Sequence, residues 1–121
     1  MKTTEEKNRI LMDFMGEKPG YNPYTKKWTW SDSPWFSCEH DTSEEVVDSI
    51  SKYAKYSTDW NWIFKIVEKI EEHRFDVEMR QSVVTIFDKD NNEDILEVVL
   101  DSKLEAVFEA CVEFIEWFNK Q

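Results

Sequence analysis

The chain has 121 residues, 40% of them hydrophobic and 15% aromatic, which is enough to bury one modest core but not two. The formal net charge of −11 argues against direct binding to nucleic acid or anionic membrane, because both require clustered lysine and arginine. With only two glycines and three prolines, the composition favours long regular elements over a turn-rich all-β sandwich.

The sequence shows no sign of membrane insertion or export. No apolar run reaches the length of a membrane span, and "MKTTEEKNRI" is charged where a signal peptide carries an apolar core. Cys38 and Cys111 give no disulfide framework, as expected in a reducing compartment. A cytoplasmic protein is therefore predicted.

The first predicted element is a helix over residues 4–15. Thr3 and Glu6 have the spacing of a capping box, in which each side chain accepts a backbone N–H that the first turn leaves unbonded. Gly16 can adopt the left-handed conformation that ends a helix. The apolar stripe of this helix consists of Ile10, Leu11, Phe14 and Met15.

The following segment is rich in proline and large aromatic residues and has no helical period. Its dipeptides "PG" and "NP" are turn signals. A short strand is predicted around residues 27–30, where Trp28 and Trp30 share a face. Further on, "DTSEEVVDSISKY" predicts a short second helix, with Thr42 and Glu45 at capping-box spacing.

Two long amphipathic helices are predicted in the second half, over residues 59–73 and 103–119. The stripe of the first consists of Ile63, Ile66, Val67 and Ile70. Trp60 lies close to this stripe and is predicted to be core, whereas Trp62 lies at its margin. Trp117 occupies a comparable margin on the last helix.

Between these helices lie three strand-like runs. "FDVEM" alternates strictly, whereas "SVVTIF" and "ILEVVL" are apolar on both faces, which is typical of a sheet covered on both sides. The polar link "DKDNNED" predicts a hairpin between the last two strands. The predicted fold class is α+β: a three-layer α/β/α sandwich containing a small antiparallel three-stranded meander, in a single domain over residues 1–121.

The first half of the polar link also matches the sequence pattern of a calcium-binding loop. Its acidic and amide groups alternate as in an EF-hand, at Asp88, Asp90, Asn92 and Asp94. The sixth position, however, is Glu93 where a glycine is needed, and the twelfth is Val99 where a bidentate glutamate is needed. A solvated hairpin tip is therefore the preferred interpretation, and no metal or cofactor is predicted.

Catalytic motifs are missing from the sequence. It contains no P-loop, no dinucleotide fingerprint and no nucleophile elbow, and its scattered cysteines and histidines do not form a zinc pattern. Most carboxylates fall on the polar faces of helices. The prediction is that the protein is not an enzyme, although a catalytic constellation assembled in space stays open, since spacing alone does not exclude one.

The aromatic residues are the strongest functional signal. One interpretation is that they complete a small core; the other is that some form an interface, because tryptophan and tyrosine are favoured anchors. The predicted interaction surface consists of Tyr24, Trp28, Trp30, Trp35, Trp62 and Trp117. Two alternatives stay open: a homodimer through this surface, and a small-molecule or enzyme pocket under the aromatic loop.

Residues 57–121 resemble a known family. "YSTDWNWIFKIVEKIEEHRFDVEM", the strands that follow and "SKLEAVFEACVEFIEWFNKQ" are similar to the phage ABA sandwich domain, a group of small proteins of phages and prophages. Residues 1–56 are less alike. The resemblance implies a three-layer α/β/α fold and a mobile-element setting, and it implies no catalytic residues.

These observations lead to one functional hypothesis. We expect an acidic accessory protein, cytoplasmic in the host cell, that acts by protein–protein interaction with a partner not identified by the sequence. One variant of the hypothesis is counter-defence, in which the acidic protein occupies the nucleic-acid cleft of a host factor.

Overall fold

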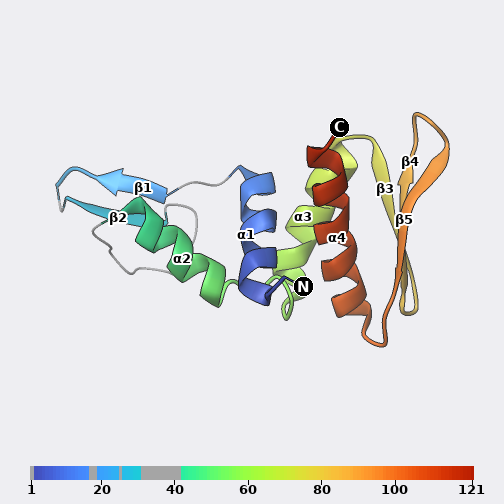
Figure 1. Ribbon diagram of the computed structural model, residues 1–121, viewed down its shortest axis with the longest axis horizontal. Coiled ribbons are helices and arrows are strands. Elements are labelled where there is room, and N and C mark those ends of the chain that lie inside the picture. The colour runs from blue at the N-terminus through green and yellow to red at the C-terminus, as the bar shows by residue number, and fades with distance from the viewer. Residues whose placement is uncertain (1, 17–18, 25, 31–41) are drawn as a thin grey trace. The chain divides into compact units, whose positions relative to one another are not determined.

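The computed structural model describes residues 2–16, 19–24, 26–30 and 42–121 (Figure 1). It confirms the α+β class. The elements follow one another as α1 (Thr4–Met15), β1 (Pro19–Asn22), β2 (Lys27–Trp30), α2 (Ser43–Tyr53), α3 (Trp60–Glu72), β3 (Phe75–Arg80), β4 (Val83–Asp88), β5 (Glu93–Val99) and α4 (Lys103–Asn119). None of the helices in the described part of the chain is long and apolar enough to cross a membrane.

The chain divides into two compact units, Met1–Ala54 and Lys55–Gln121. The boundary falls close to residue 57, where the resemblance to the phage domain is predicted to begin. The organisation as a single domain stays a prediction.

In the first unit, α1 begins and ends at the predicted residues. The Thr3 hydroxyl accepts the Glu6 backbone N–H at 3.2 Å, and the Glu6 carboxylate accepts the Thr3 backbone N–H at 3.4 Å. Gly16 ends the helix at φ 72°, a left-handed conformation that costs glycine little. The capping box and the terminating glycine are both confirmed.

The aromatic segment forms a two-stranded antiparallel ribbon. The predicted strand at residues 27–30 is confirmed as β2, and it pairs with β1. The interpretation of Pro19-Gly20 as a turn is wrong, because both residues belong to β1. Proline is tolerated there because it is the first residue of its strand. Helix α2 lies against both strands of the ribbon.

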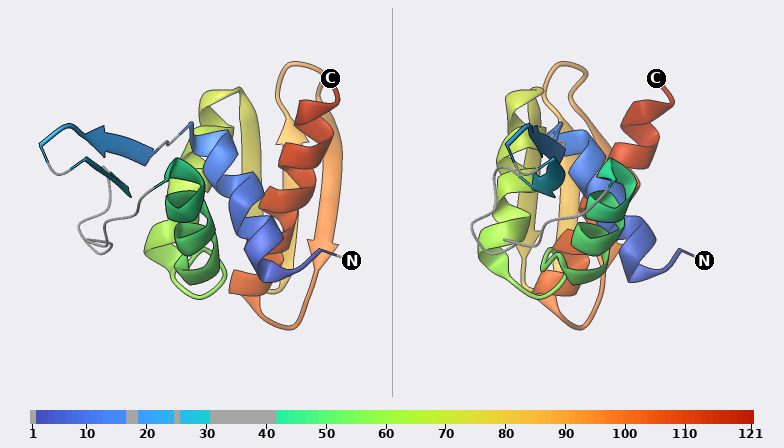
Figure 2. Two further views of the ribbon diagram at one scale, coloured as in Figure 1. Left: turned by 60° about the vertical axis from the view of Figure 1, so that its left-hand side comes forward. Right: turned by 90° about the vertical axis from the view of Figure 1, so that its left-hand side faces the viewer.

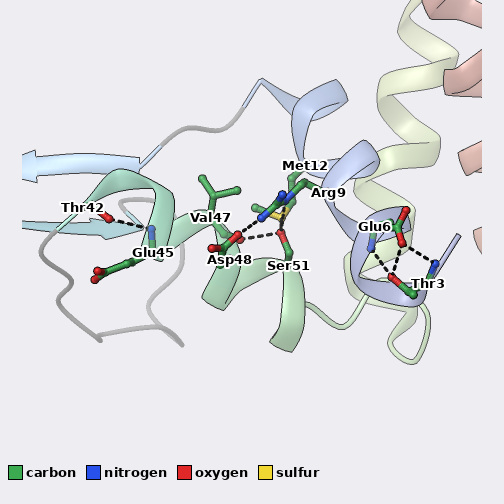
Figure 3. A network of polar contacts seen from close by, with 9 residues as sticks. All are labelled: Thr3, Glu6, Arg9, Met12, Thr42, Glu45, Val47, Asp48 and Ser51. Atoms are coloured by element: carbon green, nitrogen blue, oxygen red, sulfur yellow. Dashed lines mark hydrogen bonds and ion pairs between the residues drawn. The ribbon is translucent and has the colours of Figure 1, made fainter.

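Polar contacts join α1 to α2 (Figure 3). The Arg9 guanidinium forms an ion pair with Asp48, and its Nε donates a hydrogen bond to the Ser51 hydroxyl at 3.4 Å. Next to it, the Asn8 amide donates to two backbone carbonyls near the end of α2, those of Ser51 at 2.9 Å and Ala54 at 3.3 Å. Because Asn8 is only 1% exposed, these are buried bonds and specify how the two helices meet.

In the second unit, β3, β4 and β5 form the predicted antiparallel meander. Its register places one set of alternating side chains on a common face, and the buried apolar ones among them are Phe75, Val84, Ile86 and Val98. The link between β4 and β5 is a tight turn, so the predicted hairpin is confirmed.

Helices α3 and α4 contact each other as well as the sheet. Both lie on the same side of the sheet in Figure 1, and the left-hand view of Figure 2 shows α4 running along the strands. Residues 55–121 by themselves therefore supply two layers, one helical and one of strands. The core between these layers includes Ile63, Ile66, Ile70, Val107 and Phe114.

Side-chain caps begin both of these helices. The Asp59 carboxylate accepts the Asn61 backbone N–H at 2.8 Å, and the Ser102 hydroxyl accepts that of Glu105 at 3.4 Å. Both caps lie where the two long helices are predicted to begin. The long helices are therefore found within a residue of their predicted bounds.

Candidate interaction surface

Among the aromatic side chains of the β1–β2 ribbon that the structure describes, those of the two tyrosines are the most exposed. Tyr24, near the turn, is 95% exposed, and Tyr21 is 50% exposed. Tyr21 stands opposite Trp28 in the register, with ring centroids 5.2 Å apart and the rings tilted. Trp28 is half-buried. We call Tyr21, Tyr24 and Trp28 the aromatic hairpin.

Two further residues of the predicted surface, Trp30 and Trp35, have side chains outside the part of the chain that the structure describes. The backbone of Trp30 lies in β2, but its side chain is outside what the structure describes, as is the whole of Trp35. The predicted pocket under the aromatic loop depends on these side chains. It therefore stays a prediction.

The remaining two predicted residues belong to the second unit. Trp62 is half-buried, and its ring meets that of buried Tyr56 edge-on, with centroids 5.2 Å apart. Trp117 is also half-buried, and its ring lies 5.9 Å from the rings of both Phe75 and Phe114. Each tryptophan thus packs on one side against the core and keeps part of its ring exposed.

The prediction that Trp60 is core is wrong in degree. Trp60 is half-buried, and its ring stacks on Phe64, which is 42% exposed, with centroids 5.2 Å apart. The reason is its position: Trp60 is the first residue of α3 and lies at the edge of the apolar stripe. Its side chain therefore contacts less of the core than that of Ile63, one turn further along the helix.

The hairpin tip between β4 and β5 is built around Asp88. The Asp88 carboxylate accepts hydrogen bonds from the Asp90 N–H at 2.9 Å, the Asn91 N–H at 3.2 Å and the Asn91 amide at 2.8 Å. Burial raises the pKa of this carboxyl, but the bonds from Asn91 and Asp90 favour the charged form more strongly, so its pKa lies below the ordinary value. In the described part of the chain, no cluster of carboxylate, histidine and cysteine side chains is arranged to hold a metal ion.

Replacing Asp88 with asparagine should destabilise the protein at neutral pH. A carboxyl whose pKa is lowered by folding stabilises the native state above its unfolded pKa, about 3.9, and loses that contribution as the pH falls through its folded value. The stability difference between wild type and Asp88→Asn should therefore shrink below about pH 4, as measured by urea unfolding from pH 7 to pH 3. The exposed Asp101→Asn is the matched control, and a pH-independent difference for Asp88 would contradict this account.

Cys111 is fully buried on α4, and burial raises the pKa of its thiol. A reactive cysteine needs the opposite, a partly exposed thiol that ionises readily. Cys111 therefore has the surroundings of an unreactive core residue.

Cys111 should react with a thiol reagent at least about a hundredfold more slowly in the native chain than in urea, because labelling must wait for the core to open. The experiment uses the Cys38→Ser variant, so that one thiol is counted, and follows labelling by mass spectrometry. Equal rates in the two states would show that α4 does not bury this side chain.

Comparison of the chain with protein-family models, with curated proteins and with solved structures finds no match. The resemblance of residues 57–121 to the phage ABA sandwich domain stays a prediction. The function is therefore inferred from this chain's own surface.

One surface feature was not singled out from the sequence. The face of the β3–β5 sheet turned away from α3 and α4 carries Val83, Phe87 and Val99, and Val99 is 59% exposed. The apolar residues on both faces of β4 and β5 signalled a second buried face. This signal predicts a second helix layer, whereas α3 and α4 both lie on the other face of the sheet (Figure 1).

Proposed function

We propose that this protein is a small, non-enzymatic accessory protein that acts by binding another protein. The observation that carries the proposal is the aromatic hairpin, in which Tyr21 and Tyr24 are 50% and 95% exposed beside half-buried Trp28. Tyrosine and tryptophan bury large areas on a partner at a small entropic cost, and their polar tips can still form hydrogen bonds. The two strands of the ribbon pair with each other and contact α2, and this existing order reduces the entropy that is lost on binding.

The proposed setting is a phage or prophage protein in the cytoplasm of the host cell. The resemblance to the phage domain that the sequence predicts for residues 57–121 supports this setting. The net charge of −11 supports a partner with a basic surface, and in the counter-defence variant that surface is the nucleic-acid cleft of a host factor.

A capture experiment tests the proposal. The purified chain serves as bait in bacterial lysate, beside Tyr21→Ala/Tyr24→Ala and the control Phe64→Ala, which removes an exposed ring outside the hairpin. We expect a partner that binds wild type and the control but binds the hairpin variant about tenfold more weakly or worse. If no partner rises above background at any salt concentration, the proposal fails.

A further inference from the structure

In the second unit, charged and apolar side chains form a regular pattern on the face of the sheet that is turned away from the helices. Because side chains alternate along a strand, the register fixes which of them share this side. We call it the outer face: Asp76, Glu78, Arg80, Val83, Thr85, Phe87, Asp94, Glu97 and Val99.

Two rows across the outer face repeat one arrangement. In the first, Asp76 and Asp94 flank Phe87. In the second, Glu78 and Glu97 flank Thr85. The central strand therefore presents a less polar column with a line of carboxylates on either side.

The central column is only partly covered. Val83, Thr85 and Phe87 are half-buried, and Val99, which pairs with Val83 from β5, is 59% exposed. Within residues 55–121, all of which the structure describes, the helices lie on the opposite side of the sheet (Figure 1). A sheet with apolar residues on both faces is ordinarily covered on both.

The flanking charges are unequally compensated. Asp76 pairs with Lys89 at 3.1 Å, and Glu78 lies 3.9 Å from Arg80. On the other flank, Asp94 and Glu97 are exposed, and neither forms an ion pair with any residue in the described part of the chain. The outer face is therefore an apolar column in an acidic frame, which is most strongly negative along β5.

The spacing of this frame fits a helix. Neighbouring strands lie about 4.8 Å apart, so the two lines of carboxylates stand about 10 Å from each other. That distance equals the diameter of an α-helix with its side chains, about 10 Å. A helix lying along β4 would bring its apolar stripe over Val83, Thr85 and Phe87 and would place residues on its two flanks beside the carboxylates.

We infer that the outer face binds a basic amphipathic helix of a partner protein, which supplies the third layer. The inference rests on the proposed function and adds to it the surface and the chemistry of the partner. A second copy of this chain is a poorer occupant, because residues 55–121 contain 16 acidic and 8 basic residues, and two such surfaces repel each other.

The test uses a labelled synthetic helix of leucine and lysine, about 14 residues long, with the leucines on one face. Its affinity is measured by fluorescence anisotropy for the full chain and for two variants of equal net charge. Asp94→Lys/Glu97→Lys changes the outer face, and Glu68→Lys/Glu72→Lys changes exposed positions of α3. A peptide with glutamate in place of lysine is the second control.

We expect the outer-face variant to bind the lysine peptide about tenfold more weakly or worse, and the α3 variant less than about threefold more weakly. When the lysine peptide is added to the wild-type chain, the amide chemical shifts of residues in β4 and β5 should change. This measurement locates the bound peptide without any variant. Equal weakening by both variants, or shifts confined to the helices, would overturn the inference. Self-association in sedimentation that the outer-face variant abolishes would assign the face to a second copy instead.

The capture experiment separates this inference from the proposed function. If the captured partner binds Asp94→Lys/Glu97→Lys as well as wild type, the protein is a binding protein but the outer face is not the surface used. If no partner is captured while the peptide maps to the outer face, the surface is correctly described and the proposed function fails.

Discussion

Phe114→Ala should lower the free energy of unfolding by about 3–5 kcal/mol, the largest loss expected from truncating a side chain in this core. Phe114 is fully buried. The centroid of its ring lies 4.8 Å from that of Phe75, 5.6 Å from that of Phe118 and 5.9 Å from that of Trp117. Removing it leaves a cavity where α4 meets the first strand of the sheet. Because domains of this size are stable by about 5–15 kcal/mol, the loss is a large fraction of the total.

Urea unfolding followed by tryptophan fluorescence measures this loss, since Trp117 lies beside the cavity. The matched control is Phe64→Ala, which deletes the same atoms from a side chain that is 42% exposed and stacked on Trp60. We expect about 1 kcal/mol there, mostly from the lost ring contact. Equal losses at the two positions would mean that the contact between α4 and the sheet contributes little to stability.

Helix ends were predictable from the sequence because they are determined locally. Thr3, Asp59 and Ser102 each bond a backbone N–H within three residues, so the signal and the structure share one short segment. The stripes of α3 and α4 were equally readable, because a period of 3.6 residues specifies which side chains lie inward.

The layers of the sheet were harder to predict. Apolar residues on both sides of β4 indicated two covered faces, but periodicity does not say which element covers each. Contacts between α3 and α4 place both helices on one side of the sheet. Pro19 shows that local signals are ambiguous in a similar way. A proline–glycine pair usually indicates a turn, but proline is also tolerated as the first residue of a strand, as it is in β1.

The candidate site was predicted in part. Tyr24 and Trp28 were singled out for their residue type, and the exposure of Tyr24 agrees with a surface role. The outer face was missed because Asp94 and Glu97 look like ordinary solvated charges in a one-dimensional sequence. Only the register places each of them beside an apolar neighbour.

Asn8→Asp should destabilise the chain by about 3–5 kcal/mol at neutral pH, although the two side chains have almost the same volume. The Asn8 amide donates to the carbonyls of Ser51 and Ala54, whereas an ionised aspartate has no donor and would face both carbonyls with a buried negative charge. The effect is therefore one of hydrogen bonding and charge rather than packing.

The pH dependence of Asn8→Asp separates it from a cavity effect. Burial should raise the pKa of the introduced carboxyl above its unfolded value of about 3.9, so the penalty is present above the folded pKa and relieved as the pH falls through it. Asn8→Ala also removes the two bonds but introduces no charge, and we expect it to cost about 2–3 kcal/mol at every pH. Unfolding by urea between pH 4 and pH 8 compares the variants. If Asn8→Asp and Asn8→Ala differ by a constant amount over this range, the position is not buried as the contact between α1 and α2 requires.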